Sequence, residues 1–232
     1  MRRTSLLITG LSILLLGTTQ SEAANIGVVT LDFEGLEDTQ PIGDFYNGGS
    51  FTRADSTMVT GPDYNVVFED ALALRSEFLD PFNGTGTFTN DNFIDDSVTV
   101  LFFTEGPALL RLVEDTFFTT GFSFFYSAQF GATVDVFASD DGTGTPLVSE
   151  SLGANWQTGC ENMLGSYCNW ELAQLALAPG DEARSIVFGG DARFVGFDNI
   201  TFGSLNPVPL PPAIWLLASA LLGFAALRRR RS

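Results

Sequence analysis

The central part of the chain, residues 26–203, consists of short apolar runs separated by Gly, Asn and Asp. Apolar and polar residues alternate in several runs: Val134 and Val136 share one strand face, and Asp135 lies on the other. No run has a sustained helical period. This spacing predicts an all-β fold, an antiparallel β-sandwich or jelly roll. We expect strands at residues 28–33, 64–68, 97–103, 121–126, 132–138, 147–152, 185–188 and 194–202.

The core of this sandwich is expected to be aromatic, because the chain contains 22 phenylalanines. Residues 121–126 predict a central strand with both faces at least partly covered. Phe122 and Phe124 fall on one face of this strand, and Phe125 falls on the other. A stacking platform for sugars is the alternative role, but large apolar residues on central strands normally pack inside. Six aromatic residues are expected in this part of the core, namely Phe117, Phe118, Phe122, Phe124, Phe125 and Phe130.

The composition excludes several kinds of catalysis. The chain has no histidine, and its 11 basic residues are all arginine. Histidine-dependent acid–base chemistry, histidine-ligated metals and ordinary serine triads are therefore excluded. Schiff-base chemistry and a P-loop are excluded as well, because both need lysine. Charged residues make up 17 % of the chain, below the roughly 25 % of an ordinary soluble domain.

The positive charges are concentrated at the two ends of the chain. Between the ends, the body keeps five arginines against 27 acids, a net charge of about −22. Such a surface repels nucleic acid and anionic lipid, so neither is an expected partner. Divalent cations are favoured instead.

Residues 1–23 predict a secretory signal peptide. Arg2 and Arg3 form the basic region, Leu6–Gly17 the apolar region, and Ser21–Ala23 the cleavage site for signal peptidase. The apolar run is shorter than the roughly 20 residues that span a bilayer. An uncleaved anchor is the alternative interpretation.

The other end of the chain predicts a single transmembrane helix. Residues 208–227 carry no charge and are followed by four arginines. A helix from Pro212 to Leu227 would be about 24 Å long, enough for a thin bilayer. The positive-inside rule keeps the arginines in the cytoplasm and the body outside. A plain tail anchor is the alternative.

The C-terminal segment resembles the sorting signal of the PEP-CTERM family, in the variant that opens with Val-Pro-Leu-Pro. Leu210 stands where the more usual Pro-Glu-Pro motif has Glu. The resemblance implies recognition by an exosortase, removal of the tail, and transit to the cell surface or an exopolysaccharide matrix of a Gram-negative bacterium. The inner-membrane anchor would then be transient. The motif comprises Val208, Pro209, Leu210, Pro211, Trp215, Gly223, Arg228, Arg229, Arg230 and Arg231.

The body resembles the jelly-roll domains of PEP-CTERM proteins, which are similar to galactose-binding-like and carbohydrate-binding modules. The motifs are residues 31–34, the strand at 121–126 and the closing segment 196–202. The resemblance implies that the first and last strands are adjacent and hold a structural Ca²⁺. Its expected ligands are Glu34 and Asp198, with Asp32 as a third, and further oxygens would be needed. Alternatively, Asp198 caps a turn or faces water.

Cys160 and Cys168 enclose a loop of seven residues. Export permits a disulfide between them, and closing so short a loop would stabilise the fold by about 2–3 kcal/mol. A reactive thiol pair or a zinc site is less favoured. The aromatic residues around this loop, Trp156, Tyr167 and Trp170, are the expected glycan contacts, and packing against the body is their alternative role.

The sequence therefore predicts a signal peptide (1–23), a β-sandwich domain (24–204) and a sorting segment (205–232). We expect a non-catalytic surface or matrix protein that associates with extracellular polysaccharide and requires no cofactor. One alternative is a secreted glycan hydrolase, which needs two acids of unlike pKa. The adjacent pairs Asp95–Asp96 and Asp140–Asp141 are instead expected in turns. A purely structural adhesion protein without a small ligand is the other alternative.

Overall fold

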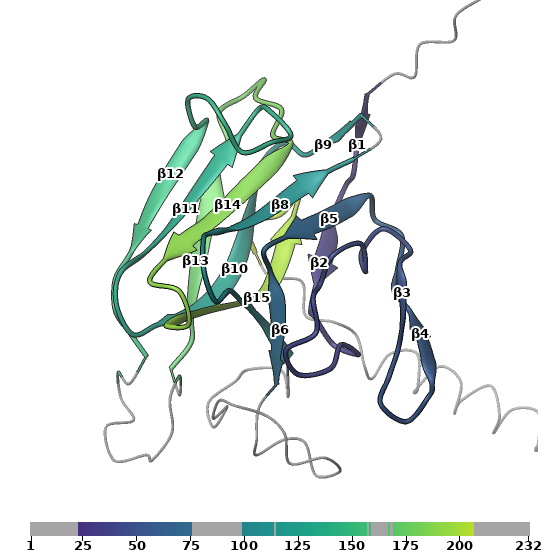
Figure 1. Ribbon diagram of the computed structural model, residues 1–232. Helices are drawn as coiled ribbons and strands as arrows, with labels where there is room; N and C mark the ends of the chain where they lie inside the picture. Colours follow the sequence, from purple (N-terminus) through teal and green to yellow (C-terminus); the bar gives the residue numbers. More distant parts are fainter. Residues whose placement is uncertain are drawn as a thin grey trace, which may run out of the picture.

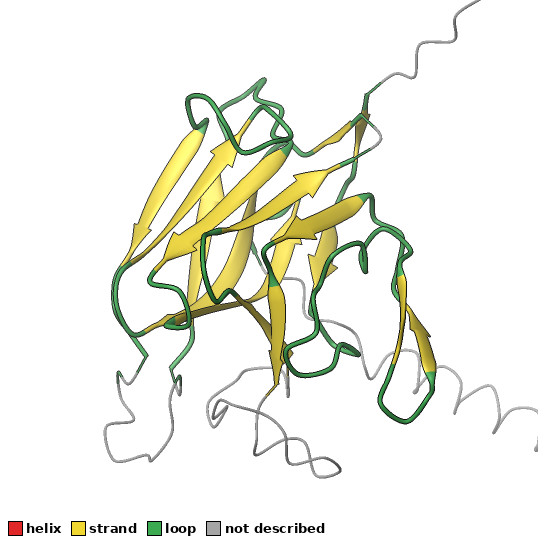
Figure 2. Ribbon diagram, in the orientation of Figure 1, coloured by secondary structure: helices red, strands yellow, loops and turns green. Residues whose placement is uncertain are grey.

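The computed structural model describes residues 23–75, 99–113, 115–156, 158, 167 and 169–206. Every regular element in these residues is a β-strand, and they contain no helix (Figure 2). The expectation of an all-β body is therefore confirmed for the described part of the chain.

Two antiparallel sheets form the body (Figure 1). The six-stranded sheet has the order β13 (Glu171–Ala176), β10 (Gly121–Ala128), β15 (Val195–Phe202), β7 (Thr99–Phe102) and β6 (Leu72–Arg75), and β2 (Val29–Leu31) also pairs with β15. The five-stranded sheet has the order β12 (Val148–Leu152), β11 (Ala132–Phe137), β14 (Ser185–Gly190), β8 (Ala108–Leu112) and β5 (Val66–Glu69).

Two small pairs of strands accompany the main sheets. β1 (Ala24–Asn25) runs parallel to β9 (Thr116–Phe117), and β3 (Ser50–Thr52) forms an antiparallel hairpin with β4 (Met58–Thr60). The β3–β4 hairpin lies to one side of the two sheets (Figure 1).

The strand orders of the two main sheets correspond. Counted along the two strand orders given above, each position is filled by two strands that follow each other in the chain, one in each sheet. These pairs are β5 and β6, β7 and β8, β10 and β11, β12 and β13, and β14 and β15. The chain thus crosses repeatedly from one sheet to the other. Two of these crossings, β5 to β6 and β7 to β8, lie next to each other at the same end of the two sheets.

An aromatic core joins the sheets. The rings of Phe124 in β10 and Phe188 in β14 lie 6.2 Å apart between centroids, and those of Phe188 and Phe197 in β15 lie 4.9 Å apart. Every residue of β10 and β15 is buried. The prediction of a central strand at 121–126 is confirmed: Phe122 and Phe124 belong to the main core, and Phe125 belongs to a second cluster on the opposite face.

All eight expected strands are present, but several others were not predicted. β8 and β13 have the sequences ALLRL and ELAQLA, which are rich in residues that favour helices. Pairing with β5 and β14 holds β8 extended, and pairing with β10 does the same for β13. Tertiary pairing therefore overrides the local preference. The short strands β1, β3, β4, β6 and β9 were not predicted either.

The expectation that Phe130 is a core residue is wrong. Phe130 lies in the turn after β10, and 47 % of its surface is exposed. Its ring packs edge-on against exposed Phe194, with centroids 5.3 Å apart. The strand pattern ends at Ala128, so alternation no longer determines on which side the Phe130 ring lies.

The turn expected at Asp140–Asp141 is confirmed, because both residues lie in the connection between β11 and β12. Gly142 has φ of +69°, a backbone conformation that favours glycine. A Cβ at this position would lie 2.8 Å from Cγ2 of Val187, so the turn also packs tightly against β14. Asp95 and Asp96 lie outside the described residues.

Phe124 and Phe130 provide a matched test of the aromatic core. Phe124→Ala should lower the free energy of unfolding by about 3–5 kcal/mol, because a fully buried ring leaves a cavity. Phe130→Ala should change it by less than about 0.5 kcal/mol, because that ring is half exposed. Urea unfolding of both variants measures the difference. Equal losses would contradict the core described here.

Candidate functional site

The carboxylates expected to bind calcium come from β15 and from the chain that leaves β2. These two strands are antiparallel neighbours, and Leu31 pairs with Ile200. Residues that follow Leu31 therefore run beside the residues that precede Ile200. This register brings Asp32 and Glu34 towards Asp198. The first and last strands of the main sheet are thus adjacent, as the family resemblance implies.

An irregularity in β15 determines the position of Asp198. The pairing of β10 with β15 shifts between Ser123 and Phe125, which leaves one extra residue on the β15 side. Asn199 at this bulge has φ of +49°. A bulge redirects the side chains beside it, and Asp198 here lies opposite Phe125 and is fully buried. The alternative in which Asp198 faces water is therefore wrong.

Tyr46 lies at the centre of the carboxylates. Its buried hydroxyl accepts a hydrogen bond from the Phe33 N–H at 2.6 Å and donates one to Oδ1 of Asp32 at 3.4 Å. Burial raises the pKa of the Tyr46 hydroxyl well above its ordinary value, and the nearby carboxylates of Asp32, Asp198 and Glu34 raise this pKa further. The phenol is therefore held neutral, as a hydrogen-bond donor to a carboxylate.

Glu34 links the same region to β7. Oε1 of Glu34 accepts a hydrogen bond from the Thr99 N–H at 3.0 Å, and the Thr99 hydroxyl approaches Oε2 at 3.5 Å. Thr99 is the first residue of β7 and is fully buried. The carboxylate thus ties the chain after β2 to the neighbouring part of the six-stranded sheet.

These contacts do not amount to a metal site within the described residues. No group of three or more His, Cys, Asp or Glu side chains is placed there so that it could hold a metal ion. Asp32 and Glu34 also already accept hydrogen bonds from the protein. The described residues alone therefore do not complete the site expected for calcium, and calcium binding stays a prediction.

Trp170 packs against the face of the six-stranded sheet that points away from the main core. Trp170 is buried beside Val100 and Phe125, and its Nε1 donates to the Tyr167 carbonyl at 2.9 Å. A Cβ on Gly196 would lie 3.0 Å from Cη2 of Trp170, so a larger residue here would require the ring to move by a few tenths of an ångström. Little of the Trp170 surface remains for a ligand.

The other two expected glycan contacts, Trp156 and Tyr167, are partly exposed. Trp156 and Tyr167 are both half-buried, and the Tyr167 hydroxyl donates to the Arg193 carbonyl at 2.8 Å. Glycan contact by these residues stays a prediction. Cys160 and Cys168, and with them the predicted disulfide, lie outside the described residues.

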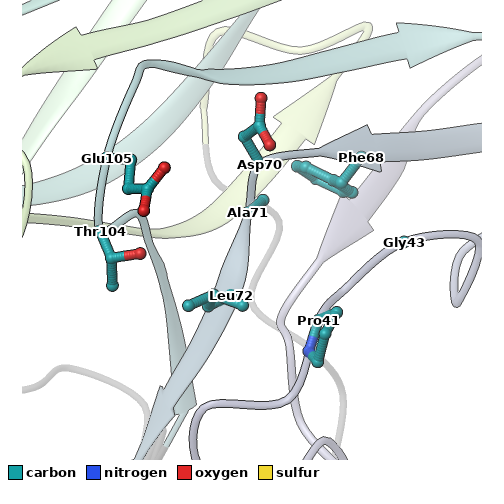
Figure 3. Close-up of a pocket in the computed structure, with 8 residues that line it drawn as sticks. All are labelled: Pro41, Gly43, Phe68, Asp70, Ala71, Leu72, Thr104 and Glu105. Carbon is teal, nitrogen blue, oxygen red and sulfur yellow. The ribbon is translucent and has the colours of Figure 1, made fainter.

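A pocket of about 290 Å³ lies at the edge of the sandwich, where the chain crosses between the sheets (Figure 3). We call it the edge pocket. One wall comes from the β5–β6 corner at Asp70 and Ala71, and another from the β7–β8 connection at Thr104 and Glu105. Its eight lining residues are Pro41, Gly43, Phe68, Asp70, Ala71, Leu72, Thr104 and Glu105.

Backbone hydrogen bonds tie together the residues of one wall of the edge pocket. The Phe68 N–H donates to the Gly43 carbonyl at 2.8 Å, and the Ile42 N–H donates to the Ala71 carbonyl at 3.1 Å. Asp70 has φ of +55°, which turns the chain sharply from one sheet to the other. The wall that contains Gly43, Phe68 and Ala71 is therefore fixed by the fold.

The sequence pattern does not predict this pocket. Asp70 and Glu105 are separated by 35 positions, and only the crossing of the chain between sheets brings them together. The one local signal was an acid immediately after the β5 run, a pattern that many turns share. A pocket formed by two crossings depends on strand order, which the sequence pattern does not reveal.

The predicted signal peptide apart from Ala23, and the full sorting motif from Val208 to Arg231, lie outside the described residues. In the part of the chain that the structure describes, no helix has the length and apolarity that a membrane span requires.

No protein-family model matches the chain, and no curated protein does either. One similar solved structure is the K1 cleaved adhesin domain of Lys-gingipain from Porphyromonas gingivalis W83, at 10 % identity and a TM-score of 0.43, covering 77 % of this chain and 98 % of that one. The K3 cleaved adhesin domain of the same protein is similar at 14 % identity and a TM-score of 0.31, covering 75 % and 90 %.

The chain is also similar to a family 43 glycoside hydrolase, an arabinoxylan arabinofuranohydrolase from Bacillus subtilis in complex with cellotetraose. The identity is 14 % and the TM-score 0.36, and the match covers 67 % of this chain and 33 % of that one. The strand pairing of the chain itself, rather than these likenesses, establishes the antiparallel β-sandwich.

Asp32 provides a test of the carboxylate region through pH. Burial raises the pKa of Asp32 above 3.8, against the opposing effect of its hydrogen bonds. The folded protein therefore binds this proton more tightly than the unfolded chain, and stability is lost as pH rises through the raised pKa. In EDTA, Asp32→Asn should raise Tm by about 2–4 °C at neutral pH. The difference should vanish below pH 3.8.

Thermal melts across this pH range measure the effect, and Asp55→Asn is the matched control. The Thr57 N–H donates to exposed Asp55 and lowers its pKa, so that variant should not raise Tm at neutral pH. A destabilised Asp32→Asn in EDTA would contradict this account.

Added Ca²⁺ tests the calcium prediction: wild type should gain thermal stability that Asp198→Ala lacks. Identical wild-type melts in Ca²⁺ and EDTA would overturn it.

Proposed function

We propose that the protein is an exported component of the cell surface or extracellular matrix that binds polysaccharide without cleaving it. The predicted signal peptide supports export, and the C-terminal segment that resembles a PEP-CTERM sorting signal supports sorting by an exosortase. The matching strand orders of the two sheets support the jelly-roll and galactose-binding-like assignment of the body.

The edge pocket is the observation that carries the binding proposal. Its volume of about 290 Å³ suits a single sugar ring, at the lower end of the range for small-molecule sites. Pro41, Phe68 and Leu72 supply apolar surface, and Asp70, Glu105 and Thr104 supply oxygen atoms. Sugars need both, because their ring faces are apolar and their hydroxyls form hydrogen bonds.

The same pocket also favours one rival function. Asp70 and Glu105 come from separate connections and line one cavity (Figure 3). Glycoside hydrolysis uses two carboxylates on opposite sides of the scissile bond, one of them as the acid that protonates the leaving group. A secreted glycan hydrolase with this pair is therefore the second candidate function.

Binding and turnover separate the two functions. The purified protein should bind polysaccharide isolated from its own host and leave the chain length unchanged. Isothermal titration measures binding, and chromatography of the polysaccharide after long incubation measures cleavage. Shortened chains whose formation stops in Glu105→Gln would establish the hydrolase instead. Absence of both binding and cleavage would overturn both functions.

The mass of the mature protein tests the sorting proposal. Protein recovered from the cell surface should lack residues 1–23 and the apolar C-terminal segment, because signal peptidase and exosortase remove them. Intact-mass spectrometry measures both ends at once. A surface protein that still ends in the four arginines would contradict exosortase processing.

A further inference from the structure

The edge pocket has charge of only one sign. Its eight lining residues, all within the described chain, include two acids and no arginine. Asp70 and Glu105 are both exposed to solvent, and Thr104 adds a half-buried hydroxyl beside them. Figure 3 shows the two carboxylates on neighbouring connections, and Leu72 and Pro41 lie farther along the pocket.

The apolar lining carries the second constraint on the ligand. Phe68 and Ala71 are buried, and Leu72 and Pro41 pair across an isolated bridge that closes this part of the wall. A hydrated metal ion would gain nothing from such a wall, because its ligands are oxygen atoms. The occupant therefore needs an apolar face as well as groups that interact with carboxylates.

Charge then distinguishes among the classes of sugar. A uronic acid or a sulfated sugar would be repelled by the two carboxylates that line the pocket. A neutral sugar would fit the wall, and its hydroxyls would donate hydrogen bonds to Asp70 and Glu105, but it would leave their negative charge uncompensated. A sugar with a protonated amine fits both parts, because an ammonium group donates charge-assisted hydrogen bonds to carboxylates.

We infer that the edge pocket is a subsite for an amino sugar with a free, protonated amine, held between Asp70 and Glu105 with its ring against Leu72 and Pro41. This inference rests on the proposed polysaccharide-binding function and names the class of sugar. The net charge of the body, about −22, acts in the same direction, because it raises the local concentration of cationic ligands.

The experiment compares two short oligosaccharides of equal length, one of glucosamine and one of N-acetylglucosamine. They share the same backbone and differ at one substituent, which is a protonated amine in the first and an uncharged acetamide in the second. Titration calorimetry of the full protein, at a mildly acidic pH that keeps the amine protonated, should show tighter binding of the glucosamine oligomer by about tenfold. Added salt should reduce that preference.

Variants of the two acids locate the binding. Asp70→Asn and Glu105→Gln should each weaken binding of the glucosamine oligomer about three- to tenfold and leave binding of the acetylated oligomer nearly unchanged. Asparagine tolerates the positive φ at position 70, so this variant keeps the corner intact. Asp140→Asn is the matched control, because it removes the same charge from an exposed turn outside the pocket.

The outcomes separate this inference from the proposed function. Equal binding of the two oligomers, or tighter binding of the acetylated one, would overturn the amino-sugar inference and leave polysaccharide binding standing. An Asp140→Asn loss as large as the Asp70→Asn loss would also overturn it, because binding would then follow net charge alone. Failure of both oligomers and of the host polysaccharide would overturn the proposed function as well.

Discussion

Phe188 of the five-stranded sheet and Phe197 of the six-stranded sheet meet in the middle of the body, with ring centroids 4.9 Å apart. Phe124 contacts both rings, at 6.2 Å and 5.7 Å. Each buried phenylalanine contributes about 1.5–3 kcal/mol through removal from water. This contact joins the two sheets face to face, and both candidate sites are built on the sandwich that it holds together.

Each candidate site lies where the chain departs from regular pairing. The carboxylates near Tyr46 meet because β2 joins β15 and a bulge at Asn199 redirects Asp198. The edge pocket forms because two crossings between the sheets lie next to each other. In the first region Tyr46 and Asp198 are buried, and hydrogen bonds tie it to Phe33 and Thr99, which suits a structural role. The second is open to solvent and suits a ligand.

Much of the fold could be predicted from local pattern. Alternation and turn residues located all eight expected strands, and the two faces of the strand at Phe122–Phe125 were assigned correctly. β8 and β13 were missed because their leucine and alanine favour helices and only strand pairing holds them extended. Phe130 was misplaced because alternation stops being informative once a strand ends. The edge pocket was missed because it depends on strand order, which places Asp70 and Glu105 around the same pocket.

The central claim is that the protein binds a sugar in the edge pocket, which the β5–β6 and β7–β8 connections form. Backbone NMR spectra of the isotope-labelled protein, recorded while an oligosaccharide is added, test this claim residue by residue. We expect the largest shifts at Asp70, Ala71, Thr104 and Glu105. Shifts concentrated at Tyr167 and β13 would place the sugar beside Trp156, Tyr167 and Trp170 instead and contradict the claim.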